Sequence, residues 1–384
     1  MGLLTKKLDS YLGIDIGGQT IKLVEFYNDG GRPKLRTYGI AEVELAFGKK
    51  ETDESPERIA KVIRQLHKKT KAASDMVVTS LPTFDVFTSI VNIPSMPKKE
   101  MAAAVAWEAK KLIPMPLEQM TWYWEELKVE VGEDEDKDRE KDKEKRPREG
   151  EVIKIKKQSK KNIHVLIVAV PSSLGAKYIE IMKNAGLNLL DMEPEVFALI
   201  RSLVGRDKSL VMLVEIGAMN TNVSIVDQGV PILSRGVDAG GVNITRLMET
   251  KMGIDAKRAE QVKKDLADYL VFKQVKNEIP EDFKIAVSPI VNEIKYIFSL
   301  VGGQASSLTL TPGNNGKIDR IILTGGSALL PYLSSHLSSV VDTKVYVGDP
   351  WARVDYPDDL KYLLEDVGPH LAIAAGLAMR RIIK

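Results

Sequence analysis

The chain alternates between two kinds of apolar pattern. Short runs rich in valine and isoleucine read as buried strands, whereas longer segments with an apolar residue at every third or fourth position read as helices. Strands are expected at 77–82, 164–170, 210–214, 223–226 and 318–323, and helices at 97–113, 172–185, 243–252, 256–271, 288–301 and 371–383. Alternation of this kind is typical of an α/β fold.

One strand–turn–strand pattern occurs twice. Residues 11–24 and residues 211–226 each contain a strand, a turn with glycine and a second strand. Each first strand has an acidic residue near its end, Asp15 in one copy and Glu215 in the other. Internal repetition indicates a repeated architecture. We therefore expect two similar lobes that face one cleft.

Residues 132–161 differ from the rest of the chain because most of them are charged, with both signs interspersed. A segment with so few apolar side chains cannot offset the entropy lost on ordering. We expect a flexible insertion within a folded α/β unit, which is either a solvated loop or a docking tail.

Composition narrows the chemistry. The 384 residues carry 55 basic and 53 acidic side chains, a net charge of +2, which argues against nucleic-acid binding through bulk charge. The absence of cysteine excludes disulfides, zinc knuckles, iron–sulfur clusters and a thiol nucleophile. The four histidines have no metal-ligand spacing. The first residues do not read as a signal peptide, and no long apolar run predicts a membrane span.

The two hairpins have the composition of phosphate-binding turns. A glycine at a hairpin turn lets backbone N–H groups converge on an anion, and the first turn consists of Gly17, Gly18, Gln19 and Thr20. The acidic residue before each turn could hold Mg²⁺ against those phosphates. Hairpins from opposite lobes would then clamp the β- and γ-phosphates of a nucleotide. For either hairpin alone, a tight turn without a ligand is the alternative.

Two further glycine pairs stand at helix starts. Gly240 and Gly241 open the helix expected at 243–252, and Gly325 and Gly326 follow a buried strand. A backbone without side chains can approach a flat or anionic ligand closely. For the second pair, a simple helix cap by Ser327 is the alternative.

The order of these features along the chain carries more information than any one of them. Two hairpins are followed by a Gly-Gly turn, a helix face with Glu260, Lys263 and Lys264, and a second Gly-Gly turn. On its own, that helix face would be an exposed ion-paired surface. The complete order resembles the actin-like ATPase superfamily.

This resemblance implies an actin-like ATPase fold, with two RNase H-like lobes around a nucleotide cleft that binds ATP or ADP with Mg²⁺. By motif, the nucleotide contacts would be Asp15, Gly17, Gly18, Gln19, Thr20, Glu215, Gly217, Asn220, Gly240, Gly241, Glu260, Lys263, Lys264, Gly325, Gly326 and Ser327. Asp15 and Glu215 would be the metal ligands. Glu193, in the segment that connects the lobes, would orient the attacking water.

Within the superfamily the chain is similar to the PilM family of type IV pilus assembly proteins. The similarity lies in residues 77–87 (VVTSLPTFDVF), 107–116 (WEAKKLIPMP), 191–199 and 319–331. The PilM and FtsA families share a relocated small subdomain. The implied parts are a first lobe of residues 1–76, 188–207 and 355–384, a small inserted subdomain of residues 77–187, a second lobe of residues 208–244 and 302–354, and a helical subdomain of residues 245–301.

The second hairpin departs from the superfamily pattern. Glu215 stands where many members have aspartate, and its carboxylate lies about one methylene further out, a displacement that matters for catalysis. Ala218 and Met219 crowd a turn that is commonly glycine-rich, and Asn222 stands where a second aspartate is common. We therefore expect ATP binding, with ATPase activity weak or absent.

The resemblance also implies a partner and a location. In the PilM family, the N-terminal cytoplasmic peptide of the inner-membrane protein PilN docks between the first lobe and the small subdomain. The chain would then be a cytoplasmic scaffold at the inner face of the membrane, held there only through its partner. Other proteins of the pilus machinery are further candidate partners, and self-association stays open.

Aromatic and apolar residues of the small subdomain are candidates for the wall of that peptide groove. They are Met101, Val105, Trp107, Leu112 and the 120–124 strand (MTWYW). Packing of Trp122 and Trp124 in the subdomain core is the alternative for the strand. The last residues form an apolar helix of small side chains, and we expect it to be buried in the first lobe rather than to bind a membrane.

Two other functions compete. An FtsA-like division filament would carry a membrane-binding tail, and a sugar or acetate kinase of the same superfamily would need a catalytic base beside a sugar pocket. The sequence gives a clear signal for neither feature.

Overall fold

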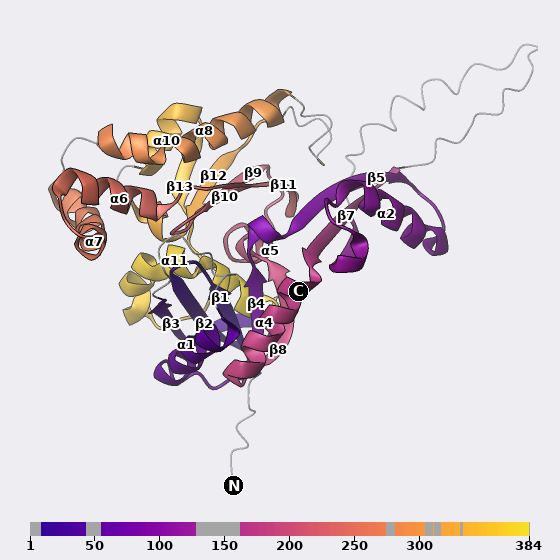
Figure 1. Ribbon diagram of the computed structural model, residues 1–384, viewed down its shortest axis with the longest axis horizontal. Helices are drawn as coiled ribbons and strands as arrows, with labels where there is room; N and C mark the ends of the chain where they lie inside the picture. Colours follow the sequence, from indigo (N-terminus) through magenta and orange to yellow (C-terminus); the bar gives the residue numbers. More distant parts are fainter. Residues whose placement is uncertain are drawn as a thin grey trace, which may run out of the picture.

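The computed structural model describes residues 9–43, 55–127, 162–273, 281–303, 310, 316–330 and 333–383. Two lobes lie one above the other, and a small sheet with its own helix extends to one side (Figure 1). The charged segment 132–161, for which we expect flexibility, lies outside the described residues.

The first lobe is built on a five-stranded sheet in the order β3-β2-β1-β4-β8. Its strands are β1 (Ser10–Ile16), β2 (Thr20–Asp29), β3 (Arg32–Glu42), β4 (Met76–Leu81) and β8 (Asn188–Pro194). The first three form an antiparallel meander, and β4 and β8 continue the sheet in parallel with β1. Helices α1 (Pro56–Lys69) and α4 (Ser172–Ala185) pack on one face, and α11 (Lys361–Met379) packs on the other.

The second lobe repeats this topology in the order β11-β10-β9-β12-β13. Its strands are β9 (Val211–Ile216), β10 (Thr221–Asp227), β11 (Val230–Val237), β12 (Arg320–Thr324) and β13 (Lys344–Val347), and its helices are α6 (Gly241–Met252), α7 (Ala256–Lys273), α8 (Glu281–Gly303) and α10 (Leu333–Val341). The matching strand orders confirm the two similar lobes that the repeated hairpin predicts.

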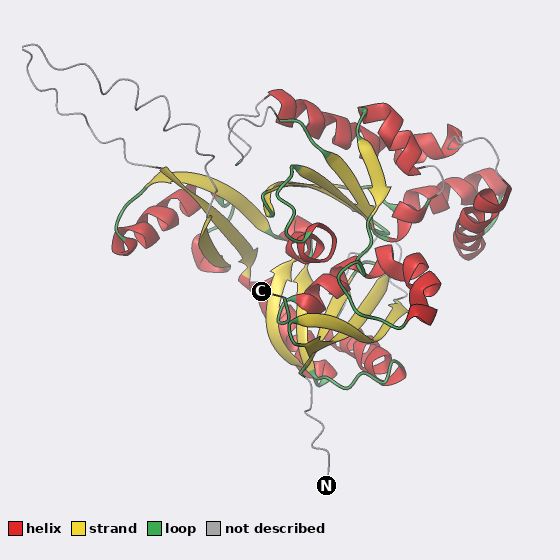
Figure 2. Cartoon of the chain, turned by 180° about the vertical axis from the view of Figure 1, so that it is seen from behind, coloured by secondary structure: helices red, strands yellow, loops and turns green. Residues whose placement is uncertain are grey.

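A three-stranded sheet, β5-β7-β6, forms the small subdomain (Figure 2). It contains β5 (Phe87–Pro94), β6 (Met120–Leu127) and β7 (Asn162–Pro171), with α2 (Lys98–Leu112) on one face. Trp122 and Trp124 of β6 pack against that core, whereas Tyr123 between them is 49% exposed. The tryptophans are therefore core residues, which is the alternative that the sequence leaves open for this strand.

The sheet pairing places both ends of segment 77–187 outside the small sheet. Strand β4 pairs with β1 and β8, so it is a central strand of the first lobe. Helix α4 packs its Tyr178, Ile181 and Met182 into the core of the same lobe. The strands of the inserted sheet span only 87–171, because the chain leaves the first lobe after β4 and returns to it at α4.

Short helices connect these elements. They are η2 (Thr83–Asp85), η3 (Leu117–Gln119), α5 (Glu195–Leu199), η5 (Ile200–Val204), η6 (Gly326–Leu329) and η7 (Asp358–Leu360). Local chemistry sets several boundaries. Ser55 caps α1 by accepting from the backbone of Arg58, and Gly186 ends α4 with a φ of 78°, a conformation that glycine adopts without steric cost.

The final helix begins earlier than its pattern predicts. Helix α11 starts at Lys361, ten residues before the expected 371, and continues through Pro369. Its second half, from Leu371 to Met379, is buried throughout, which confirms packing in the first lobe. Among the described residues, one helical stretch, Phe283–Gly303 of α8, is long and apolar enough to cross a membrane by composition. Ile290, Ile294 and Ile297 of that helix lie in the core of the second lobe.

Candidate functional site

The first hairpin holds a buried ion pair beside its turn. Asp15, near the end of β1, is 1% exposed and lies opposite Lys22 in the register of β1 and β2. The Lys22 ammonium donates to Asp15 Oδ2 at 2.8 Å, and Ser80 Oγ donates to Oδ1 at 3.0 Å. The turn closes through a bond from Gly17 N to Thr20 O, and a side chain at Gly17 would meet the Lys22 ammonium at 3.4 Å. The cation therefore lies against the turn.

The second hairpin has the same geometry with different charges. Glu215 lies opposite Asn222, whose Nδ2 donates to Glu215 Oε2 at 3.2 Å. The turn closes through Gly217 N and Asn220 O at 2.9 Å, as in the first hairpin. Here the group across the strand pair is a neutral amide.

Glu195 joins the two lobes beside these hairpins. It opens α5, and its Oε2 accepts from Thr83 N at 3.1 Å, Thr83 Oγ1 at 2.8 Å and Asn222 Nδ2 at 3.1 Å. Burial raises the pKa of Glu195 well above its ordinary value, and the neighbouring carboxylates of Glu215 and Asp15 raise it further. This carboxyl therefore holds its proton more tightly than a free glutamate.

Lys22 is the positive charge among these acids. Burial by itself would lower the pKa of Lys22, but Asp15, together with Glu215 and Glu195, raises it above its ordinary value. The ammonium therefore stays charged and offers a cation to an anionic ligand in the cleft.

Both Gly-Gly turns converge on the second hairpin. Gly241 N donates to Gly217 O at 3.0 Å, so the start of α6 is joined directly to the turn. Gly325, at a φ of 86°, lies so close that an added Cβ would stand 2.4 Å from Ile216 O. An added Cβ on Gly241 would stand 2.4 Å from Ser327 Oγ, which brings the two turns together. The packing at these positions therefore leaves no room for a side chain, which explains why they are glycines.

The charged helix face points partly inward. Lys263 Nζ contacts Glu260 Oε2 at 2.6 Å, Thr245 Oγ1 at 3.1 Å and Gly241 O at 3.2 Å. Lys264 is 55% exposed and reaches Glu42 of the first lobe at 3.6 Å. Lys264 therefore belongs to an exposed ion-paired surface, whereas Lys263 does not.

His370 of α11 also reaches this cleft. An added Cβ on Gly326 would stand 2.6 Å from its ring. Burial lowers the pKa of His370 to about 4, and the positive charges of Lys22, Lys264 and Lys263 contribute. The ring is neutral at physiological pH.

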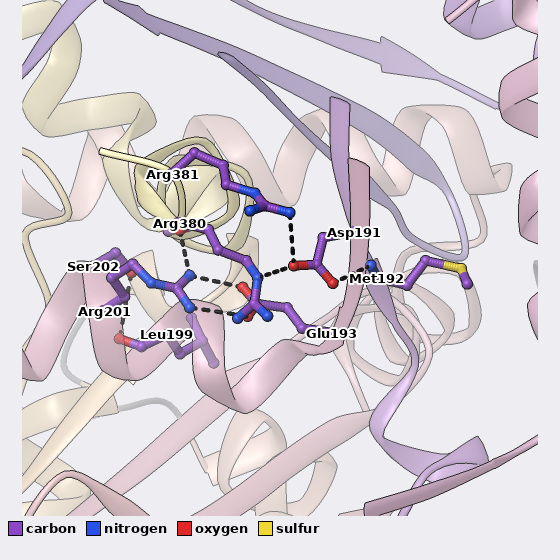
Figure 3. A network of polar contacts seen from close by, with 9 residues as sticks. Asp191, Met192, Glu193, Leu199, Arg201, Ser202, Arg380 and Arg381 are labelled. Atoms are coloured by element: carbon purple, nitrogen blue, oxygen red, sulfur yellow. Dashed lines mark hydrogen bonds and ion pairs between the residues drawn. The ribbon is translucent and has the colours of Figure 1, made fainter. Parts of the chain in front are cut away.

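The surroundings of Glu193 do not suit a residue that orients water. Its carboxylate is 3% exposed and accepts from Arg201 at 2.7 and 2.9 Å and from Arg380 at 2.6 Å (Figure 3). Arg380 also binds Asp191 at 2.6 Å, so the network fastens the end of α11 to strand β8. Both Glu193 oxygens are therefore occupied by guanidinium groups. Glu195, two residues later, instead contacts Thr83 and, in the second hairpin, Asn222.

Three residues of this site are missing from the candidates that the sequence suggests. Lys22 has a usable signal, because it is the cross-strand partner of Asp15 in a hairpin whose register the turn fixes. Glu195 stands beside Pro194, where the strand changes into a helix, and only the position of that change decides which glutamate faces the cleft. His370 comes from the far end of the chain and has no local signal.

The proposed wall of the peptide groove is only partly at the surface. Met101 and Val105 are buried in the subdomain core at 5% and 0% exposure, so neither can contact a partner. Trp107, at 60% exposure, and Leu112 lie on the outside of α2, with the Lys111 ammonium 2.9 Å from the centre of the Trp107 ring. The positive charge of Arg380 acts on the Tyr123 hydroxyl, so these two side chains lie near each other.

Comparison with known proteins agrees with this architecture. The chain is similar over 97% of its length to a solved chain described as the PilM-PilN type IV pilus biogenesis complex, with a TM-score of 0.74, 23% identity and 99% of that chain covered. It is also similar to the ethanolamine utilization protein EutJ from Carboxydothermus hydrogenoformans, with a TM-score of 0.54, 14% identity and coverage of 97% and 89%.

A curated relative matches a part of the chain. The cell division protein FtsA of Bacillus subtilis is 26% identical over 183 residues, which are 44% of this chain and 41% of FtsA. A sequence model of the family described as "Type IV pilus assembly protein PilM" matches residues 13–140 and 150–382. This match spans nearly all of the chain, including both hairpins, both Gly-Gly turns and α11. The chain belongs to the PilM family of type IV pilus assembly proteins.

Proposed function

We propose that the chain is an ATP-binding scaffold of type IV pilus assembly. The observation that carries the nucleotide part is the arrangement of the two hairpins. Asp15 with Lys22 and Glu215 with Asn222 occupy equivalent positions in the strand registers, so each turn has a carboxylate beside it. Lys22 would bind a phosphate oxygen, and the Gly-Gly turns would lie under the nucleotide.

The residues present fit a magnesium ion that is held largely through phosphate and water. Asp15 and Glu215 supply hard carboxylate oxygens, and Asn222 Oδ1 is buried with no hydrogen-bond partner. Among the described residues, no group of three or more His, Asp or Glu side chains could hold a metal ion by itself. When bound, Mg²⁺ would neutralise phosphate charge.

For any hydrolysis we propose Glu195, not Glu193, as the residue that orients water. Thr83 and Asn222 already donate to its Oε2, so an attacking water would compete with existing donors for that oxygen. This competition supports slow turnover, and with it a binding protein rather than a fast ATPase.

Purified protein tests the nucleotide proposal directly. Titration with a fluorescent ATP analogue should give saturable, Mg²⁺-dependent binding. Asp15→Ala should remove this binding, because it takes away a candidate metal ligand and the ion-pair partner of Lys22. Equal affinity in the variant, at an unchanged melting temperature, would show that the first hairpin is not the phosphate site.

We further propose that the partner is the cytoplasmic N-terminal segment of PilN, bound between the small subdomain and the first lobe. Tyr123 of β6 in the small subdomain and Arg380 at the end of α11 interact electrostatically across this junction, which supports the location. The chain would then lie at the cytoplasmic face of the membrane through that partner. Calorimetric titration with a synthetic PilN N-terminal peptide, with and without ATP and Mg²⁺, tests this. An absence of binding at high micromolar peptide rejects it.

A division filament of the FtsA kind is the second candidate, favoured by the partial match to FtsA. Sedimentation of the protein with ATP and Mg²⁺ separates the two, because a filament would pellet and a soluble scaffold would not.

A further inference from the structure

A cavity of about 770 Å³ lies in the first lobe, outside the nucleotide cleft and the small subdomain. It is framed by the turn between β2 and β3, the end of η5, the loop before η7 and the end of the chain after α11. None of its lining residues comes from the small sheet at 87–171, so it is distinct from the junction proposed for PilN.

Three arginines from three separate segments meet at this cavity. Arg32, Arg206 and Arg353 line it, and all three are exposed. None of the three forms an ion pair with a carboxylate of the part of the chain that the structure describes. Arg201 also lines the cavity, but its charge is offset by Glu193. Positive charge is therefore available at this surface for an external anion.

Arg353 is held in place before any ligand arrives. Its Nη2 donates to the backbone oxygens of Arg201 at 2.9 Å and Ser202 at 2.8 Å. Its guanidinium lies over Gly205, where an added Cβ would stand 2.6 Å from Nη1 and where φ is +68°. Burial lowers the pKa of Arg353, with Asp349 opposing the shift. The guanidinium is thus partly desolvated and fixed without a neutralising carboxylate in contact.

The frame around the arginines is equally fixed. Asp355 N donates to Pro33 O and Leu35 N donates to Asp355 O, each at 2.9 Å, so the loop is joined to β3. Arg32 and Arg353 are carried by these two paired segments. Because the backbone that carries these two arginines is held in place, less entropy is lost when a ligand binds.

The rest of the lining decides which anion fits. Phe197, Ile200 and Ile383 give the cavity an apolar side, and Asp355 also lines it. A free phosphate would leave the apolar side unused, whereas a peptide can place an apolar side chain there and carboxylates on the arginines. We propose that this cavity binds an acidic peptide segment of a partner protein, with its carboxylates on Arg32, Arg206 and Arg353 and an apolar side chain against Phe197.

The test uses the whole chain and a set of fluorescein-labelled pentapeptides. Each carries three Asp or Glu residues and one Leu or Phe, and a matched set carries Lys in place of the acids. Saturable binding of at least one acidic peptide, and of no basic one, is expected in anisotropy titrations. If no acidic peptide binds, or if the basic set binds equally well, the proposal is overturned.

Charge reversal then locates the site. Arg206→Glu and Arg32→Glu should each weaken peptide binding by roughly tenfold at low salt, since each places a like charge against the ligand. Arg258→Glu, at an exposed arginine of α7 outside the cavity, is the matched control and should leave the affinity unchanged. Equal affinity in the cavity variants and the control overturns the proposal.

Two other possible occupants of the cavity would each give a different experimental result. Competition by inorganic phosphate alone at low millimolar concentration would identify a simple anion site and reject the peptide. Self-association of the protein that Arg206→Glu abolishes, measured by analytical ultracentrifugation, would make a second copy of the chain the occupant. Nucleotide binding and PilN-peptide binding should be unchanged in these variants, so failure here is separable from failure of the proposed function.

Discussion

The two hairpins differ in one cross-strand position. Asp15 faces Lys22 in the first lobe, and Glu215 faces Asn222 at the equivalent place in the second. The first hairpin therefore contains its own counter-charge, whereas the second places a carboxylate beside a neutral amide and a second acid, Glu195. In the proposed function the two copies of one fold would take different roles, because the first hairpin would supply a fixed cation and the second would favour a bound metal ion.

Removal of the fixed cation should have the largest effect. Lys22→Met is expected to weaken ATP binding by about 100-fold, since charge-assisted bonds to phosphate contribute roughly 1.5–3 kcal/mol. Titration with a fluorescent ATP analogue measures it. Lys264→Met, at the exposed lysine on the rim, is the control and should have a much smaller effect. Similar losses of ATP affinity in both variants would mean that Lys22 contributes only to the overall positive charge of the site and makes no specific bond to phosphate.

Conversion of the second hairpin into the first should change the metal requirement. Asn222→Lys places an ammonium across from Glu215, as Lys22 lies across from Asp15. The ratio of ATP affinities with and without Mg²⁺ is expected to fall roughly tenfold, because a fixed charge replaces part of the metal's role. Asn222→Gln keeps a neutral amide and should preserve the ratio. An unchanged ratio in the lysine variant would contradict the division between the hairpins.

The acidic residues around Glu195 should make the stability of the folded protein depend on pH. Because the pKa of Glu195 is raised in the folded protein, ionisation of this group costs stability as pH rises from the ordinary glutamate value through the folded value. Glu195→Gln should therefore raise the melting temperature at pH 8 by roughly 2 °C, the effect of about 1 kcal/mol. The gain should vanish toward pH 4. An equal gain in melting temperature at pH 8 and pH 4 would show that the gain does not come from the ionisation of Glu195.

The smallest expected effect concerns His370. Its folded pKa is about 4, below the ordinary value of 6.5, so the folded protein binds fewer protons than the unfolded chain between these values. Stability is therefore present above pH 6.5 and is lost as pH falls toward 4. His370→Gln should make this decline shallower in denaturant titrations, with the two proteins compared at pH 8 as reference. An equally steep decline in the variant would show that the ring accepts its proton without penalty.

The sequence predicts the hairpins well because their information is local. Alternating apolar residues, a glycine turn and an acid near the strand end are all visible in residues 11–24 and 211–226. The Gly-Gly turns are also correctly placed at helix starts, and the contacts of Gly325 explain why no side chain is allowed there. The similarity of the two lobes follows from these elements and is confirmed by the strand orders.

The sequence is less informative where a property depends on distant parts of the chain. Glu193 and Glu195 both flank Pro194, but Arg201 and Arg380 occupy the oxygens of Glu193, whereas Glu195 contacts Thr83 and Asn222. The limits of the inserted sheet depend on β4 pairing with two strands far from it in sequence. His370 enters the site from a helix near the end of the chain, which no local pattern reveals.

The packing of α11 limits how the two lobes can move. An added Cβ on Gly13 would stand 1.9 Å from Ala374 O, and one on Gly376 would stand 2.0 Å from Ala198 O, so the helix is in backbone contact on two sides. If the helix slid along its axis, residues with side chains would move to the positions of these glycines, where only a hydrogen atom fits. Near the cleft, Pro369 O accepts from Gly325 N at 3.0 Å and ties the helix to the second lobe. The helix should therefore move as one body with the first lobe, and opening or closing should be a rotation about the contact between Pro369 and Gly325.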